Sequence, residues 1–410
     1  MTASSIAFMM TAPAQTTTMS VFVDPLIASL GVSRSAVSTA YLVGTLGCAM
    51  LVPFLGRTID RYGLRRATGA IALCFGVILI ASSVATDIVG LTVAFVGIRV
   101  SGQGALQLAA TTIVAAYLHE RRGLGIGISS AFGAAGISLA PVLVERLVSA
   151  WGWRTVWIIE GVSVVTLVVP AVLLLLPRRP AKGTAVGVPP ARRPAEFEDW
   201  TLRRTLRTGM FWVVTGGVAI VALVAAALHF HQVSVLGERG LTQSEAAATF
   251  LPQTIAGLLT TLVAGWLADR LSARVLLALT MIFVVLGIIG AGWLSRGPTV
   301  VVYSLAIGAA ANGIRAIEAA VFARHFGTVH LGAIRGTVHG ITVGVSAFGP
   351  LMLALGRELA ESYQPVLLIT ALLPLAVAIA AFVVRTPERA EPNPRDLTQQ
   401  EESTDREDVR

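Results

Sequence analysis

Apolar runs follow one another along almost the whole chain, and this feature constrains the fold most. Each run is near the roughly 20 residues that an α-helix needs to cross a hydrocarbon core about 30 Å thick. Twelve runs are centred near residues 17, 46, 76, 104, 136, 165, 222, 255, 284, 311, 344 and 374. Only 13% of the residues are charged, against about 25% in ordinary soluble domains. The sequence therefore predicts an all-α integral membrane protein with twelve transmembrane helices.

The first run begins almost at Met1 and has neither a basic segment before it nor a small-residue cleavage site after it. A secretory signal peptide has both features. We therefore expect the first run to be a retained membrane-spanning helix.

Basic residues gather on one side of the predicted membrane. The formal net charge is +8. If the amino terminus is cytoplasmic, nine arginines and the eight bases between Arg178 and Arg207 lie in cytoplasmic loops, whereas the opposite loops hold six arginines. An excess of Lys and Arg marks the cytoplasmic side, so we predict a multi-pass protein of the cytoplasmic membrane with both termini inside. Bases that face anionic lipid headgroups explain the positive charge without a nucleic acid partner.

One constant offset of 209 residues aligns the two halves of the chain. It places "LGVSRSAVSTAY" (30–41) over "RGLTQSEAAATF" (239–250), and "GRTIDRYGLR" (56–65) over "GWLADRLSAR" (265–274). It also places Gln103 over Asn312. Internal repeats of this kind are common in transporters. We therefore predict two pseudo-symmetric six-helix bundles, residues 1–178 and 208–386.

The segment between the two bundles, residues 179–207, is rich in Pro, Gly and charge, which predicts a cytoplasmic linker. Near its end, Asp199 or Thr201 is placed to cap a short basic amphipathic helix. Trp200 and Trp212 are expected in the headgroup zone. Residues 387–410 have no apolar face to bury, which predicts a disordered cytoplasmic tail.

The segment "GRTIDRYGLRR" resembles the signature G-x-x-x-D-[RK]-x-G-x-[RK] of the major facilitator superfamily, and "GWLADRLSAR" resembles a degenerate copy with Ser272 in place of the glycine. The resemblance covers residues 5–385 and implies a secondary active transporter rather than an enzyme. In that family the aspartate latches the cytoplasmic ends of the two halves in the outward-facing state. The resemblance assigns this latch to Gly56, Asp60, Arg61, Arg65, Asp269 and Arg270. The alternative is that these charges only anchor loop ends at the membrane surface.

A narrower resemblance lies in "RVSGQGALQLAATTIVAAYLHERRGLGIGISSAFGAAGISLAPVL" and in "WGWRTVW", together with "TAPAQTTTMSVFVDPLIASLGVSRS" near the start. These segments are similar to the monocarboxylate and oxalate/formate transporters of the superfamily. The resemblance implies a small organic anion as the substrate, with a monocarboxylate first. Members of that group place a basic residue in the eighth helix, where this chain has only Gln253.

The fifth apolar run carries a competing signal. Residues 127–143, "GISSAFGAAGISLAPVL", are similar to the motif G-x8-G-x3-G-P-x-x-G-G of proton-coupled drug antiporters, but Ala140 replaces one glycine and Val144-Glu145 replace the final pair. Small residues at these positions also suit close helix packing. A proton-coupled drug or metabolite efflux antiporter is therefore the alternative function.

Arg99 marks the predicted substrate site. It lies near the middle of the fourth run, and Gln103 and Gln107 follow it at intervals of four residues, which places all three on one face of an α-helix. A charge that faces lipid at this depth costs at least about 2.5 to 3.5 kcal/mol, so the face is expected to meet a cavity or a partner. The alternative role for Arg99 is that of a structural donor to the ends of neighbouring helices.

Helices 1, 4, 7 and 10 line the central cavity in the superfamily, and the tenth run carries a similar polar face. In "NGIRAIEAA", Asn312, Arg315 and Glu318 share one face, and we expect both Arg99 and Arg315 to be buried. The predicted substrate-binding residues are Arg99, Gln103, Gln107, Asn312 and Arg315. Glu318 could exchange partners with Arg315 when an anion arrives, which makes Glu318 the first candidate for proton coupling and Asp24 the second. The alternative is a self-neutralising Arg315–Glu318 pair with a packing role.

Other classes of function are disfavoured. The sequence has no G-x-x-x-x-G-K-[ST] loop, so no nucleotide is expected. Cys48 and Cys74 are the only cysteines and lie in apolar runs, which indicates neither a disulfide nor a zinc site. His229 and His231 stand about 200° apart on a helix, so at most one is expected to contact substrate. We expect no metal and no cofactor. The polar face expected in the cavity argues against a membrane sensor of the same fold.

Overall fold

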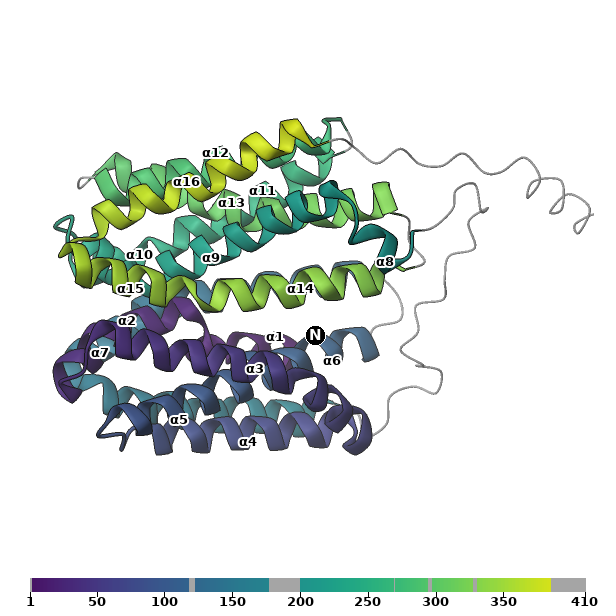
Figure 1. Ribbon diagram of the computed structural model, residues 1–410. Coiled ribbons are helices and arrows are strands. Elements are labelled where there is room, and N and C mark those ends of the chain that lie inside the picture. The colour runs from purple at the N-terminus through teal and green to yellow at the C-terminus, as the bar shows by residue number, and fades with distance from the viewer. Residues whose placement is uncertain are drawn as a thin grey trace, which may run out of the picture.

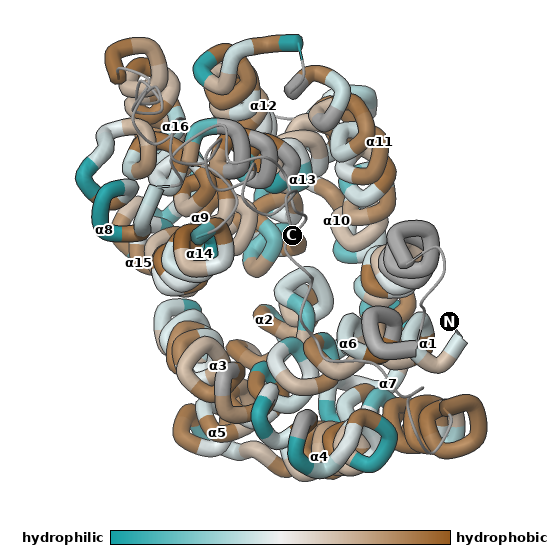
Figure 2. Tube along the Cα trace, turned by 90° about the vertical axis from the view of Figure 1, so that its right-hand side faces the viewer, coloured by the Kyte–Doolittle hydropathy of each residue, from teal (hydrophilic) through white to brown (hydrophobic). Residues whose placement is uncertain are grey.

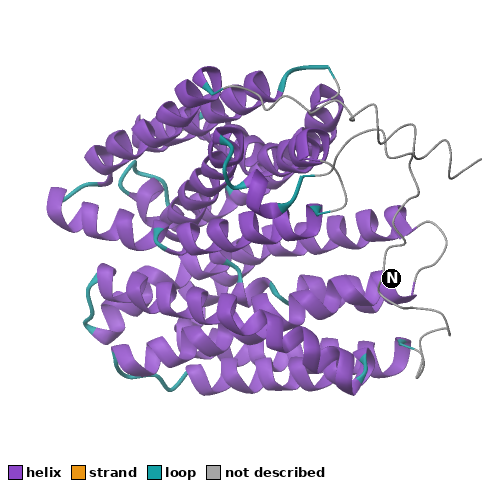
Figure 3. Ribbon diagram, turned by 45° about the vertical axis from the view of Figure 1, so that its right-hand side comes forward, coloured by secondary structure: helices purple, strands orange, loops and turns teal. Residues whose placement is uncertain are grey.

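The computed structural model describes residues 2–117, 122–176, 200–268, 270–293, 297–326 and 330–384, and every regular element in these ranges is a helix (Figure 3). Within them, nine helical stretches are long and apolar enough to cross a membrane. One stretch, Ala131–Leu175, contains two helices that meet at Gly152, whose φ is +76°. The twelve predicted run centres all fall within helices. The all-α membrane fold is confirmed, and the count of twelve crossings stays a prediction.

The first group of helices is formed by residues 2–176. Its elements are α1 (Thr2–Met9), η1 (Ala12–Ala14), α2 (Thr16–Leu30), α3 (Arg34–Tyr62), α4 (Leu64–Ser82), α5 (Ile88–Ile98), η2 (Arg99–Leu106), α6 (Gln107–Tyr117) and α7 (Arg122–Leu175). The elements α5, η2 and α6 follow one another without interruption, and η2 is a π-helix.

The second group is formed by residues 200–384. Its elements are α8 (Leu202–Thr205), α9 (Gly209–Gly237), α10 (Gln243–Ala248), α11 (Phe250–Ala268), α12 (Ala273–Trp293), α13 (Pro298–Phe326), α14 (Leu331–Ala347), α15 (Gly349–Ala360) and α16 (Tyr363–Val383). Figures 1 and 2 show the two groups side by side, with their long helices roughly parallel. We call the end that carries α8 the linker end and the opposite end, where α15 packs against α3, the distal end (Figure 1).

The 209-residue offset is visible at equivalent turns of the two groups. Gly31 and Gly240 both have a positive φ, of 64° and 83°, a conformation that glycine adopts without steric cost. Two residues later, Ser33 caps α3 and Thr242 caps α10, each accepting a hydrogen bond from the backbone N–H three residues on. The repeat therefore encodes the same glycine turn and the same helix cap twice.

Apolar side chains cover the outward surface of several helices. On α11 the exposed side chains include Ile255, Leu258, Leu259, Leu262 and Val263, and Figure 2 shows hydrophobic colour along α11 and α7. Between helices, glycines allow close contact: Gly308 of α13 lies against the Gln253 backbone of α11. Such packing is typical of helices in lipid, where small residues let backbones approach.

The linker end confirms one of the two predicted helix caps. Thr201 caps α8 by accepting a hydrogen bond from the Arg204 N–H, whereas Asp199 lies outside the described residues. Trp200 is buried against Phe326, with ring centroids 5.7 Å apart, and its backbone N–H donates to the Phe326 carbonyl at 3.2 Å. The expected place of Trp200 and Trp212 in the headgroup zone stays a prediction.

Candidate functional site

The first apolar run is a broken helix. The helix α1 ends at Met9, η1 covers residues 12–14, and α2 begins only at Thr16. Pro13 lacks the N–H that an α-helical ladder needs, and Gln15 is extended, with φ −79° and ψ 146°. The break frees backbone groups in the middle of the run, among them the carbonyl of Ala14.

Arg99 fills the space beside this break. Its side chain is buried, with 4% exposed. The guanidinium donates to the Ala14 carbonyl oxygen at 3.1 Å and lies 4.6 Å from the centre of the Tyr41 ring. Among the described residues, no carboxylate lies within ion-pair distance of Arg99. Its described partners are thus a backbone carbonyl at a helix break, as the structural-donor alternative predicts, and an aromatic ring.

The two glutamines that follow Arg99 are partly exposed. Gln107 accepts a hydrogen bond from Gln15 at 3.2 Å, and the buried Oε1 of Gln103 has no hydrogen-bond partner. The prediction that Gln103 and Gln107 share one face with Arg99 assumed a regular α-helix. The segment η2 is instead a π-helix with a wider turn, so a step of four residues covers less than one full turn. Single π-helical turns occur frequently at functional sites.

The predicted face of the tenth run is only partly formed. Asn312 donates to the Gly308 carbonyl at 3.3 Å, and its amide lies against Gly257 of α11. Arg315 is exposed, so the prediction that it is buried is wrong. The predicted pairing of Glu318 with Arg315 is also wrong.

The carboxylate of Glu318 pairs instead with Arg335 of α14, at 3.5 Å. The Glu318 side chain is only 14% exposed, and Arg335 on the neighbouring helix supplies its counter-charge. Arg315 is therefore left on the surface of α13. The structure does not bring these three residues into contact with Arg99.

Gln253 belongs to a buried amide network within the second group. It donates to the Gln232 side-chain oxygen at 3.1 Å, and the Tyr303 hydroxyl donates to the same oxygen at 3.1 Å. Gln232 in turn donates to Thr249 at 2.5 Å. Neutral polar side chains of α9, α11 and α13 thus contact one another here. The resemblance to monocarboxylate transporters implied a basic residue on the helix that carries Gln253.

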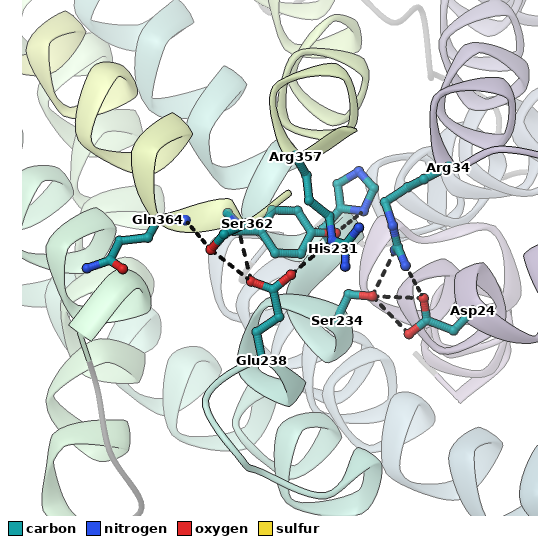
Figure 4. A network of polar contacts seen from close by, with 9 residues as sticks. Asp24, Arg34, His231, Ser234, Glu238, Arg357, Ser362 and Gln364 are labelled. Atoms are coloured by element: carbon teal, nitrogen blue, oxygen red, sulfur yellow. Dashed lines mark hydrogen bonds and ion pairs between the residues drawn. The ribbon is translucent and has the colours of Figure 1, made fainter. Parts of the chain in front are cut away.

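Contacts between the two groups gather toward the distal end, where we call the polar set in Figure 4 the closure network. Asp24 of α2 accepts from Arg34 of α3 at 2.6 Å. The Ser234 hydroxyl of α9 lies 2.8 Å from both oxygens of Asp24 and accepts from Arg34 at 2.8 Å. One serine of the second group is therefore bound by an ion pair of the first group.

The closure network continues on α15. Arg357 pairs with Glu238 at 2.9 Å, and Glu238 also accepts from the backbone N–H of Tyr363 at 3.2 Å. Beside them, Glu358 accepts from the backbone N–H of Ser35 at 2.9 Å. A carboxylate of the second group thus stabilises the first turn of α3, where unpaired N–H groups favour negative charge.

His231 lies beneath this network and is almost completely buried, with 1% exposed. Its Nε2 lies 2.9 Å from the Pro350 carbonyl and 3.3 Å from the Ser38 hydroxyl, so it joins α9 to α3. The rings of Tyr41 and Phe230, one from each group, lie 4.4 Å apart. These packed side chains join the two groups beside Arg99, which lies over the Tyr41 ring.

A second seam joins α7 to α10 and α11. Glu145, which is buried, accepts from Ser244 at 2.5 Å and from Ser149 at 3.0 Å. Ser138 donates to the Phe250 carbonyl at 3.2 Å. One signal in the sequence points to Glu145, since it replaces a glycine of the antiporter motif, but its role at the seam was not predicted. Both seams therefore join the two groups toward the distal end.

The predicted latch residues lie near the linker end and contact their own group. Arg61 lies over the Tyr62 ring, Arg65 donates to the Leu173 carbonyl, and Arg270 lies over Trp266. Gly56 is partly exposed. The side chain of Asp60, and all of Asp269, lie outside the described residues, so the latch stays a prediction.

Comparison with protein families gives one broad match. A family model described as the Major Facilitator Superfamily matches residues 4–295 and 230–406. Among curated proteins, human monocarboxylate transporter 14 is 30% identical over 133 residues. That match covers 32% of this chain and only 26% of the human protein.

Solved structures share the fold at low sequence identity. A bacterial homologue of the human lysosomal transporter Spinster, in an inward-facing and occupied conformation, has a TM-score of 0.69 at 16% identity, covering 95% of this chain and 98% of that one. The nucleoside transporter NupG has a TM-score of 0.74 at 12% identity, with 93% and 98% covered. A D-xylose-proton symporter has 0.70 at 14% identity, with 95% and 98% covered.

Proposed function

We propose that this chain, which belongs to the Major Facilitator Superfamily, carries a small organic anion across the membrane by alternating access. Its family makes it a multi-pass membrane transporter rather than an enzyme. The favoured substrate is a monocarboxylate, and the favoured coupling ion is a proton. The two bundles, residues 1–178 and 208–386, rock about the site at Arg99 while residues 179–207 connect them.

The observation that carries this proposal is the buried guanidinium of Arg99. It is 4% exposed, faces Tyr41 and the Ala14 carbonyl, and has no carboxylate partner among the described residues. A substrate carboxylate supplies the missing negative charge through charge-assisted hydrogen bonds. The similarity of a 133-residue segment to human monocarboxylate transporter 14 supports the same substrate class.

The closure network suggests how access alternates. With the distal end closed by Asp24, Arg34 and Ser234, substrate reaches Arg99 from the linker end. Opening the distal end breaks the contacts of Ser234 and Glu358 with the first bundle, and the Asp60 latch then holds the linker end closed. The difference in free energy between these two sets of contacts determines the populations of the two conformations.

Proton coupling is assigned to Glu318 first and to Asp24 second. Each carboxylate has an arginine partner in this conformation, Arg335 for Glu318 and Arg34 for Asp24. Asp24 bonds across the two bundles, so a proton on its carboxylate weakens the distal closure. Glu318 bonds only within the second bundle.

Counterflow in proteoliposomes tests the proposed function. Vesicles loaded with unlabelled propionate, oxalate or benzoate are diluted into the labelled compound, with the neutral amides as matched controls. The proposal predicts transient accumulation of at least one labelled carboxylate and of none of the amides. Exchange of amides or of cationic compounds, without exchange of any carboxylate, contradicts it.

A further inference from the structure

We infer that the break in the first helix is the carboxylate subsite of this transporter. The substrate carboxylate binds at the amino terminus of α2, against the backbone amides of Thr16 and Thr17, with the guanidinium of Arg99 beside it. This inference rests on the proposed function and adds the groups that hold the anion.

The amino terminus of α2 is uncapped. Its first backbone bond joins the Met19 N–H to the Gln15 carbonyl at 3.0 Å, so the amides of the first turn have no partner within the helix. The N-cap residue Gln15 makes no side-chain cap, because its amide donates to Thr11 and to Gln107 instead. A helix of 15 residues with free N–H groups presents the positive end of its dipole, which favours an anion.

A short window exposes this terminus. Residues 11–14 and 18–23 are buried, whereas Gln15, Thr16 and Thr17 between them are partly exposed. The window coincides with the start of α2, where the free amides lie. The Thr17 hydroxyl oxygen is itself without a hydrogen-bond partner.

Arg99 points into the same place. It donates to the carbonyl of Ala14, two residues before Thr16, and lies over the ring of Tyr41. The Tyr41 hydroxyl lies 2.6 Å from the Thr16 hydroxyl, so Arg99 and Thr16 contact the same tyrosine. The Arg99 side chain is more than nine-tenths buried, and its Nε has no partner. A carboxylate has two oxygens, one for the helix amides and one for the guanidinium.

A substitution at the N-cap separates this subsite from a general loss of folding. Gln15→Asp places a carboxylate of the protein itself at the free amides, whereas Gln15→Asn offers a neutral cap of the same size. Both residues are good N-caps, and both remove the same contacts of Gln15 with Thr11 and Gln107. The purified full-length variants are compared by thermal shift with acetate, propionate, oxalate and benzoate at constant ionic strength, and with the corresponding amides.

The inference predicts that Gln15→Asn, whose neutral cap occupies the free amides, binds the carboxylates more weakly than the wild type does. Gln15→Asp should bind them about tenfold more weakly again, or not at all, because its negative charge also repels the anion. The unliganded melting temperature of Gln15→Asp should be no lower than that of Gln15→Asn. Wild-type carboxylate affinity in both variants overturns the subsite while the proposed function stands. If none of the carboxylates stabilises or exchanges with the wild type, the proposed function fails, and the subsite fails with it.

Discussion

Ser234→Ala should shift the protein away from the conformation that is closed at the distal end. The Ser234 hydroxyl connects the second bundle to the Asp24–Arg34 ion pair of the first, with all three heavy-atom distances at 2.8 Å. Its removal leaves Asp24 and Arg34 paired within one bundle. The substitution therefore weakens a contact that exists only when the bundles meet at this end.

The expected magnitude follows from the charges and their exposure. Hydrogen bonds to charged groups contribute about 1.5 to 3 kcal/mol. The Asp24 and Arg34 side chains are 35% and 15% exposed, so solvent screening reduces this contribution. A net loss of about 1 to 2 kcal/mol changes the ratio of the two states by about 5- to 30-fold.

Distances between spin labels measure this ratio. Val84 and Leu359 are 75% and 88% exposed, lie near the distal end in different bundles, and are suitable labelling sites after Cys48 and Cys74 are replaced. Ser234→Ala should enlarge the long-distance population. The matched control is Thr39→Val, since the Thr39 hydroxyl donates only to the Ser35 carbonyl of its own helix. Identical distance distributions for wild type, Ser234→Ala and Thr39→Val would refute the reasoning.

Three further predictions concern carboxylates. Glu145→Gln should open the distal end more than Glu358→Gln in the same distance measurement. The reason is that Glu145 is buried between two serine hydroxyls, whereas Glu358 is exposed. A larger effect of Glu358→Gln would contradict this prediction. Glu318→Gln should keep substrate exchange in proteoliposomes but lose uptake driven by a pH gradient, and persistent gradient-driven uptake would move the coupling to Asp24. Asp60→Asn should cut transport while carboxylate affinity in a thermal-shift assay survives, whereas wild-type uptake would remove the latch role.

The helical architecture could be predicted because its signals are local or periodic. Length and hydropathy locate the helices, and the 209-residue offset predicts that the turn at Gly31 recurs at Gly240. The burial of Arg99 also followed from one argument, the cost of a charge in hydrocarbon. Each of these inferences needs only the properties of one segment.

The pairing of side chains could not be predicted in the same way. Glu318 was assigned to Arg315 because they share a helix face, but the partner comes from a different helix, as Arg335. The role of Glu145 depends on Ser244, a residue 99 positions away. Such contacts depend on how helices are placed against one another, which hydrophobic patterns do not encode.

Breaks in regular helices were missed for a related reason. Pro13 signals an interruption, but the sequence does not show that α2 starts uncapped at Thr16 or that Arg99 of a distant segment donates to the Ala14 carbonyl there. The π-helical segment η2 has an ordinary helical sequence pattern and lies against Ala14 and Phe75 through Gly102. Both departures are set by tertiary contacts and both lie at the proposed site.

Parallel uptake assays on wild type and Arg99→Lys test the central claim, that Arg99 binds an anionic substrate. A labelled carboxylate panel is measured in proteoliposomes beside accumulation of a lipophilic cationic dye, with Arg203→Lys, an exposed arginine at the linker end, as the control. The account predicts carboxylate uptake by wild type and by Arg203→Lys. It predicts that Arg99→Lys loses most of this uptake, because an ammonium cannot reproduce the two parallel bonds of a guanidinium. Extrusion of the dye with no carboxylate carried, and an Arg99→Lys variant that behaves as wild type, would contradict it.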